Sequence, residues 1–127
     1  MNCKNDIQNV FNLIGANGCY FLSLCTLGEV YTNKKVDIID VYFYSLKNNL
    51  ITKDCFIFDG AKIMEYITGK KWECIYSENS KDGYYNIICY GYKTNTHFEL
   101  ENHKTLENSI IRKYGKIISY RCYKVVK

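Results

Sequence analysis

The second half of the chain constrains the fold most, because it contains four segments with the composition of β-strands. Each is rich in β-branched and aromatic residues. They are residues 71–77, 84–92, 96–102 and 116–126. A turn cluster ending in Asp82-Gly83 separates the first two, and residues 92–95 fit a hairpin turn between the second and third. Short connections of this kind predict an antiparallel sheet.

The first half of the chain predicts three helices. Gly18 precedes an almost continuously apolar stretch that fits a buried helix of about 12 residues, beginning at or just before Cys19. Residues 36–49 repeat apolar side chains at helical spacing, with acidic residues early and a lysine late. A shorter helix fits between Asp59, as its N-cap, and Gly69, as its C-terminal stop. Helices followed by strands indicate an α+β fold.

Length and composition predict one domain over residues 1–127, with the apolar and charged fractions of an ordinary globular protein. No apolar run approaches the roughly 20 residues that span a bilayer, so we expect no membrane partner. The first ten residues lack the apolar stretch of a secretory signal, so we expect a cytoplasmic protein.

The charge balance does not predict a nucleic-acid partner. The chain has 17 Lys and Arg against 13 Asp and Glu, and its lysines are scattered singly or in pairs such as Lys34-Lys35. Proteins that bind nucleic acids usually concentrate these cations on one face. The chain contains no proline and is rich in Asn, Lys, Ile and Tyr. That bias indicates AT-rich coding, which is common in phages and plasmids.

The seven cysteines do not form a recognisable metal or redox motif. An odd number cannot pair completely within one chain, and no two cysteines have the C-x-x-C spacing of zinc or thioredoxin sites. We therefore expect free thiols that pack as small apolar side chains, and no metal or organic cofactor. The cysteines are Cys3, Cys19, Cys25, Cys55, Cys74, Cys89 and Cys122.

Cys19 is the cysteine with a chemically favourable position. It follows residues 15–18, Gly-Ala-Asn-Gly, at the start of the apolar helix. The positive end of a helix dipole stabilises a thiolate, and flanking glycines let backbone N–H groups face a bound carbonyl oxygen. Cys25 should point into the core. His97 falls on a strand that we expect to be central, whereas His103 lies in a polar turn and should be solvated.

The order of these residues resembles that of papain-like cysteine hydrolases. Residues 15–29, GANGCYFLSLCTLGE, look like the nucleophile segment of such peptidases, and residues 96–100, THFEL, look like their histidine strand. Over residues 7–123 the chain is similar to a small papain-like family of spirochaete plasmids and phage-like elements. Members of that family end in a strand of the type Tyr-Gly-x-Ile-x-Ser-x-Arg-x-Tyr, and residues 114–123 here read YGKIISYRCY.

The resemblance implies a papain-like α+β fold in which the nucleophile's helix packs on the sheet that carries the base. It makes Cys19 the nucleophile and His97 the general base. The usual oxyanion-hole glutamine has a candidate in Gln8, and two nearer amide side chains could take its place. These are Asn12 and Asn17.

The resemblance also implies a third residue that orients the histidine ring. In the family this is an acidic residue ten to eighteen positions after the histidine, where this chain has Glu107 and Asn108. The implied activity is amide hydrolysis, with a protein, a peptide or a peptidoglycan cross-link as substrate. Acyl transfer would use the same residues, so the sequence does not distinguish it from hydrolysis.

A second interpretation is an inactive papain-like protein of a phage or mobile element that binds and inhibits a host protein. Exposed aromatic side chains would then form the contact surface. The candidates are Tyr42, Tyr44, Tyr84, Tyr85, Tyr90 and Tyr92. Reactivity separates the two interpretations, because a catalytic Cys19 must react faster than the other six thiols.

Overall fold

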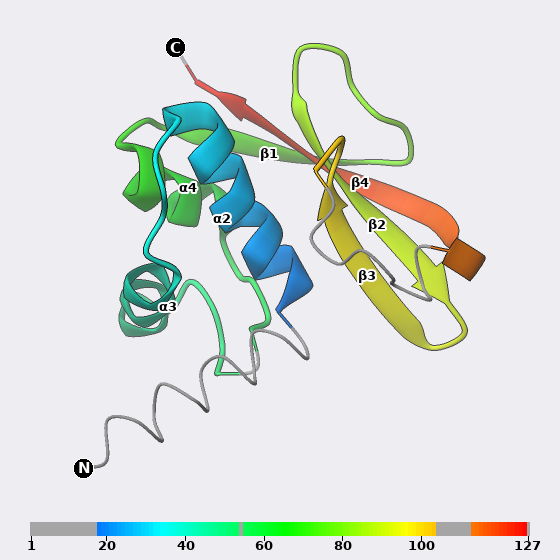
Figure 1. The fold of residues 1–127 in the computed structure, drawn as a ribbon, viewed down its shortest axis with the longest axis horizontal. Helices are drawn as coiled ribbons and strands as arrows, with labels where there is room; N and C mark the ends of the chain where they lie inside the picture. Colours follow the sequence, from blue (N-terminus) through cyan, green and yellow to red (C-terminus); the bar gives the residue numbers. More distant parts are fainter. Residues whose placement is uncertain (1–17, 54, 104–112, 127) are drawn as a thin grey trace.

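The computed structural model describes residues 18–53, 55–103 and 113–126 of the chain. These residues form three helices and a four-stranded antiparallel sheet, which confirms the expected α+β class. Figure 1 shows the helices together on the left and most of the sheet on the right, where helix α2, Cys19–Thr32, packs on strand β3, Asn95–Leu100. None of the helices in this part of the chain has the length and apolarity that crossing a membrane requires.

Helix α2, Cys19–Thr32, has apolar side chains on almost all sides because it lies between the other helices and the sheet. It packs against β3 and against helix α4, Gly60–Thr68. The helix ends at Asn33, which adopts the left-handed conformation with a φ of 57° and donates its backbone N–H to the Glu29 carbonyl. Asparagine is one of the few residues that tolerates this conformation.

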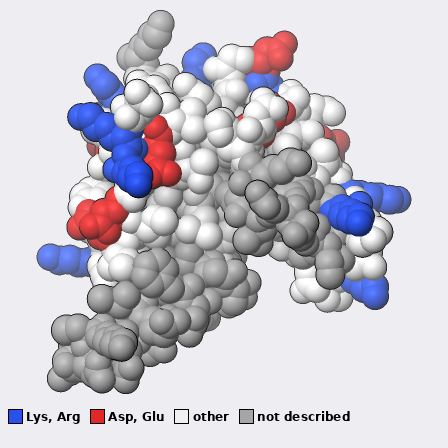
Figure 2. Space-filling model, viewed as in Figure 1, with Lys and Arg blue, Asp and Glu red and all other residues white. Residues whose placement is uncertain are grey.

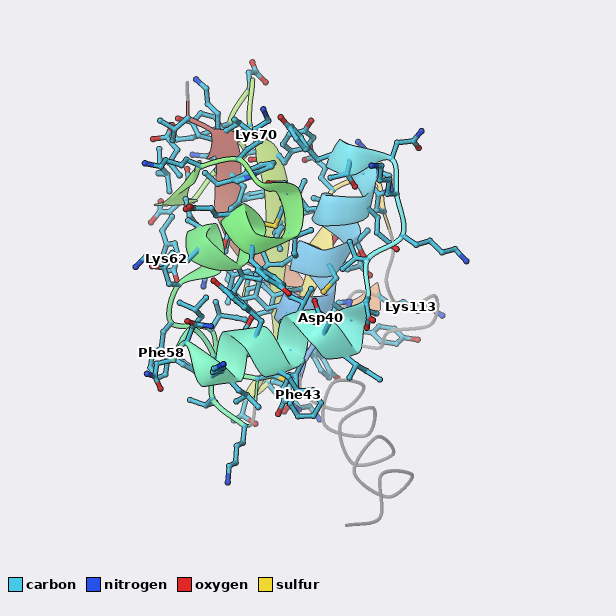
Figure 3. The ribbon with its side chains drawn as sticks, turned by 90° about the vertical axis from the view of Figure 1, so that its left-hand side faces the viewer. Asp40, Phe43, Phe58, Lys62, Lys70 and Lys113 are labelled. Atoms are coloured by element: carbon cyan, nitrogen blue, oxygen red, sulfur yellow. The ribbon has the colours of Figure 1, made fainter. Side chains whose placement is uncertain are left out.

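Helices α3, Ile38–Lys47, and α4, Gly60–Thr68, each begin with an aspartate N-cap. The Asp37 carboxylate accepts from the Asp40 N–H at 3.1 Å, and the Asp59 carboxylate accepts from the Lys62 N–H at 3.0 Å. Figure 3 shows α3 and α4 in front of α2, with Asp40 and Lys62 labelled. The prediction that Asp59 begins α4 and Gly69 ends it is confirmed.

The strands are β1, Trp72–Ser77, β2, Tyr85–Tyr92, β3, Asn95–Leu100, and β4, Lys116–Val125. Their order across the sheet is β1-β4-β2-β3, and every neighbouring pair is antiparallel. The expected hairpin joins β2 and β3 through Lys93 and Thr94. Because β4 inserts between β1 and β2, β3 has one neighbour among the strands that the structure describes. The expectation that His97 lies on a central strand is therefore wrong: it lies on an edge strand.

The core fills the space between the helices and the sheet, and its largest members are fully buried. They are Phe21, Leu24, Leu27, Ile63, Met64, Ile87 and Tyr123. Tyr42, expected as a possible surface contact, is 2% exposed, so that expectation is wrong for this residue. Its hydroxyl donates to the Lys53 carbonyl, which lets a tyrosine be buried without losing a hydrogen bond.

Charged side chains are dispersed over the face of the molecule shown in Figure 2. Lys and Arg side chains lie at separate places around its rim, and Asp and Glu lie beside several of them. Exposed aromatic side chains occur on the helices and on the sheet: Phe43 of α3 and Phe58 before α4 are labelled in Figure 3, and Tyr76 of β1 is also exposed. Exposed charge alone therefore does not mark a site on the face that Figure 2 shows.

Candidate active site

Cys19 is the first residue of α2, as the sequence predicts. The preceding residue, Gly18, is the N-cap and has no side chain that could accept a hydrogen bond from the helix. The first-turn N–H groups of any α-helix have no acceptor within the helix, and the helix dipole is positive at this end. Cys19 therefore lies where backbone N–H groups can stabilise a negative charge on sulfur or on a bound carbonyl oxygen.

The first turn of α2 is attached to the free edge of the sheet at Phe98. The Phe98 N–H points away from β2 and donates to the Cys19 Sγ at 3.4 Å. On the same edge, the Ser23 Oγ lies 3.3 Å from the Phe98 carbonyl oxygen and 2.7 Å from the Cys19 carbonyl oxygen. An edge strand has unpaired backbone groups, and here they hold the thiol in place beside β3.

His97 precedes Phe98, and its side chain lies between Cys19 and Glu99. The Nε2 atom of His97 is 3.0 Å from the Glu99 Oε1, and both side chains are buried, with exposures of 3% and 5%. The His97 ring also interacts with the Cys19 side chain, because a hydrogen bond between the two shifts the pKa of each. Since Nε2 is engaged by Glu99, we infer that Nδ1 is the ring nitrogen that serves the thiol.

The pKa values of the two residues are shifted toward an ion pair. Burial raises the pKa of Cys19, but hydrogen bonds from His97 and from the Phe98 N–H, with the imidazolium charge, bring it below its ordinary value. The hydrogen bond to Cys19 raises the pKa of His97 against the effect of burial, and Glu99 raises it further. Both shifts favour a thiolate beside an imidazolium, which is the reactive form of a cysteine nucleophile.

Other cysteines differ from Cys19 in this respect. All six cysteines in the described part of the chain are free thiols. Burial raises the pKa of Cys25 to about 12, and it also raises the pKa of three further cysteines. These three are Cys74, Cys89 and Cys122. In the same residues, no three His, Cys, Asp or Glu side chains are grouped so as to hold a metal ion.

The structure brings together two of the residues predicted for the site, Cys19 and His97. The other candidates lie outside the described residues and stay predictions. They are Gln8, Asn12 and Asn17 for the oxyanion, and Glu107 and Asn108 for orienting the histidine. His103, predicted to be solvated, is exposed.

Glu99 is a site residue that was not among the predicted candidates. Its signal is present in the sequence, because residues two apart on a strand lie on the same face. The carboxylate of Glu99 must therefore lie on the side of β3 that carries the His97 ring. What the sequence does not show is that both side chains are buried, and burial makes their pairing strong.

Comparison of the chain with models of protein families, with curated proteins and with solved structures found no match. The functional interpretation therefore depends on the geometry around Cys19.

Proposed function

We propose that this protein is a papain-like thiol hydrolase that cleaves amide bonds, with Cys19 as nucleophile and His97 as general acid and base. The observation that carries the proposal is the contact between a thiol at a helix N-terminus and a buried histidine that is itself held by Glu99. A nucleophile, a base and a residue that orients the base are the parts that this chemistry requires. The order of Cys19 and His97 along the chain is that of papain-like peptidases.

The first half of the reaction forms a thioester. The Cys19 thiolate attacks the carbonyl carbon of the substrate, a C–S bond forms, and the carbonyl electrons move to oxygen. N–H groups at the start of α2 are placed to stabilise that oxyanion. As the intermediate collapses, the C–N bond breaks and the His97 imidazolium gives its proton to the leaving amine.

The second half releases the acid and restores the pair. Neutral His97 takes a proton from water, and the resulting hydroxide attacks the thioester carbonyl. The C–S bond then breaks, the carboxylic acid leaves, and Cys19 departs as thiolate beside the imidazolium. If an amine replaces water in this step, the same residues transfer the acyl group. Throughout the cycle Glu99 acts as a positioning residue, because it contacts His97 and not the reacting atoms.

Site-mapped alkylation tests this proposal. The native protein is treated with limiting iodoacetamide at pH 6 and pH 8, and modified cysteines are quantified by mass spectrometry. A thiol with an ordinary pKa near 8.5 reacts about 80-fold faster at pH 8 than at pH 6. We expect Cys19 to be the first cysteine labelled at pH 6. Its alkylation rate should increase much less than 80-fold between pH 6 and pH 8. His97→Gln should restore the steep pH dependence, whereas His103→Gln, which changes an exposed histidine, should not.

Turnover gives the second measurement. A mixture of fluorogenic peptide amides should be hydrolysed by the native protein and by Cys74→Ser, but not by Cys19→Ser. Cys74 is a suitable control because it is a free, partly buried thiol on β1. If Cys19 labels no faster than the other thiols, catalysis is excluded. The remaining interpretation is then a binding protein that acts through exposed aromatic side chains.

A further inference from the structure

Strand β4 presents a row of polar side chains to the helical side of the sheet. Ser119, Arg121 and Tyr123 alternate along the strand and therefore share one face. Tyr123 identifies that face as the one under α2, because its hydroxyl is 2.6 Å from the hydroxyl of Tyr20, the residue after Cys19. This row belongs to the terminal strand YGKIISYRCY, and the catalytic pair does not use it.

The Arg121 guanidinium lies between two aromatic rings. Its Cζ atom is 3.9 Å from the ring centroid of Tyr76 on β1 and 5.4 Å from that of Phe98 on β3. Its Nη1 donates to the Ser119 Oγ at 2.7 Å. Aromatic faces and a neighbouring hydroxyl fix the guanidinium in position without neutralising its charge.

Arg121 is close to the nucleophile through Phe98. The Phe98 ring faces the guanidinium, while its backbone N–H donates to the Cys19 Sγ. Tyr20 stacks on the same ring with a centroid distance of 4.7 Å. Cys89 pairs with Phe98 across β2 and β3 and with Ser119, the acceptor of Arg121, across β2 and β4. Phe98 thus contacts the guanidinium with its ring and the thiol with its backbone N–H.

The guanidinium has hydrogen-bonding capacity that the described residues leave unused. An arginine side chain has five N–H donors. Among the residues the structure describes, only Ser119 accepts from Arg121, and Nε has no partner although it is buried. The one ion pair among these residues is that of His97 and Glu99, so no described carboxylate neutralises Arg121.

From these observations, and on the basis of the proposed function, we propose that Arg121 binds a carboxylate of the substrate within one residue of the scissile amide. The substrate class is then an acidic peptide: either an Asp or Glu side chain or a free terminal carboxylate supplies the anion. A guanidinium fork matches a carboxylate in geometry and charge. The aromatic rings of Tyr76 and Phe98 would contact the apolar part of the same residue. Arg121 is thus a specificity residue of the site.

The test uses three alkylating probes that differ only in charge. Iodoacetyl-glutamine amide is neutral, iodoacetyl-glutamate amide carries a side-chain carboxylate, and iodoacetyl-glutamine carries a terminal carboxylate. In each case the Cys19 thiolate displaces iodide and forms a thioether. Rates at Cys19 are measured by site-mapped mass spectrometry, and each charged probe is compared with the neutral one. At least one charged probe should react about tenfold faster, the effect of one charge-assisted hydrogen bond.

Arg121→Gln should remove this preference, and the probe that loses it identifies the source of the carboxylate. Lys124→Gln is the matched control, because it removes an exposed positive charge from the opposite face of the same strand. It should leave the preference unchanged. In the native protein the preference should also fall as salt rises, which does not depend on any variant folding.

Three results would overturn the proposal. If charged and neutral probes react equally while Cys19 still labels fast, Arg121 does not select substrates but the catalytic pair stands. If Lys124→Gln lowers the preference as much as Arg121→Gln does, the effect is one of net charge. If even the neutral probe labels Cys19 no faster than other thiols, the proposed function fails and the substrate proposal fails with it.

Discussion

The buried pair of His97 and Glu99 allows a quantitative prediction about stability. Removing one partner of a buried ion pair costs about 3–5 kcal/mol, because the other charge is left without compensation. The side chains here are 3.0 Å apart and almost fully buried. Glu99→Gln keeps an oxygen that can accept from the ring, which retains about 1 kcal/mol. We therefore expect Glu99→Gln to lower the free energy of unfolding by about 2–4 kcal/mol near pH 6.

A double-mutant cycle isolates the pair from the other contacts of each residue. The native protein, His97→Gln, Glu99→Gln and the double variant are unfolded in urea. The interaction energy is the change in unfolding free energy of the double variant minus the sum of the changes in the two single variants. The loss of the interaction between His97 and Cys19 occurs in both variants that lack His97, so its free energy cancels. The free energy of any further contact of Glu99 cancels in the same way. We expect an interaction energy of about 2 kcal/mol near pH 6.

The pH dependence of this energy has a defined sign. The pKa of His97 is raised in the folded protein, by its hydrogen bond to Cys19 and also by Glu99. A histidine of this kind stabilises the fold fully below its unfolded pKa, near 6.5, and the stabilisation is lost as pH rises through the folded pKa. The interaction energy should therefore fall as pH rises from 6 through the raised pKa of His97. An energy below about 0.5 kcal/mol near pH 6 would refute the reasoning, since independent sites add within that margin.

Three other predictions concern the scaffold that holds the site. Gly60→Ala should lower the free energy of unfolding by about 1–3 kcal/mol, measured in urea, because the new Cβ would overlap the Tyr123 hydroxyl; an unchanged midpoint would contradict this. Cys25, whose pKa burial raises to about 12, should resist iodoacetamide at pH 9 in the native protein and react only after unfolding; rapid native labelling would disprove its burial. Asp59→Ala should cost about 1 kcal/mol in urea unfolding because the Lys62 N–H loses its cap, and Asp59→Asn should restore most of it.

Local patterns in the sequence predicted most of the secondary structure. The N-cap Asp59 and the left-handed Gly69 mark both ends of α4, because capping depends on residues within one turn of the helix. The two-residue turn at Lys93 and Thr94 also depends on neighbours in sequence. The site was partly predictable for a similar reason. A cysteine at the start of an apolar helix is visible in the sequence, and so is a histidine on a strand.

The contact between Cys19 and His97 was decided by tertiary structure, since 78 positions separate them in sequence. The order β1-β4-β2-β3 places β3 at the edge, and only an edge strand offers a backbone N–H to the thiol. Nothing local in the segments shows that β4 inserts between β1 and β2. Burial of Glu99 and the placement of Arg121 beside Phe98 likewise depend on which strands become neighbours. The sequence alone determined the helices, the strands and the reactive residue types, because these follow from short-range geometry. Their assembly into a site required long-range packing.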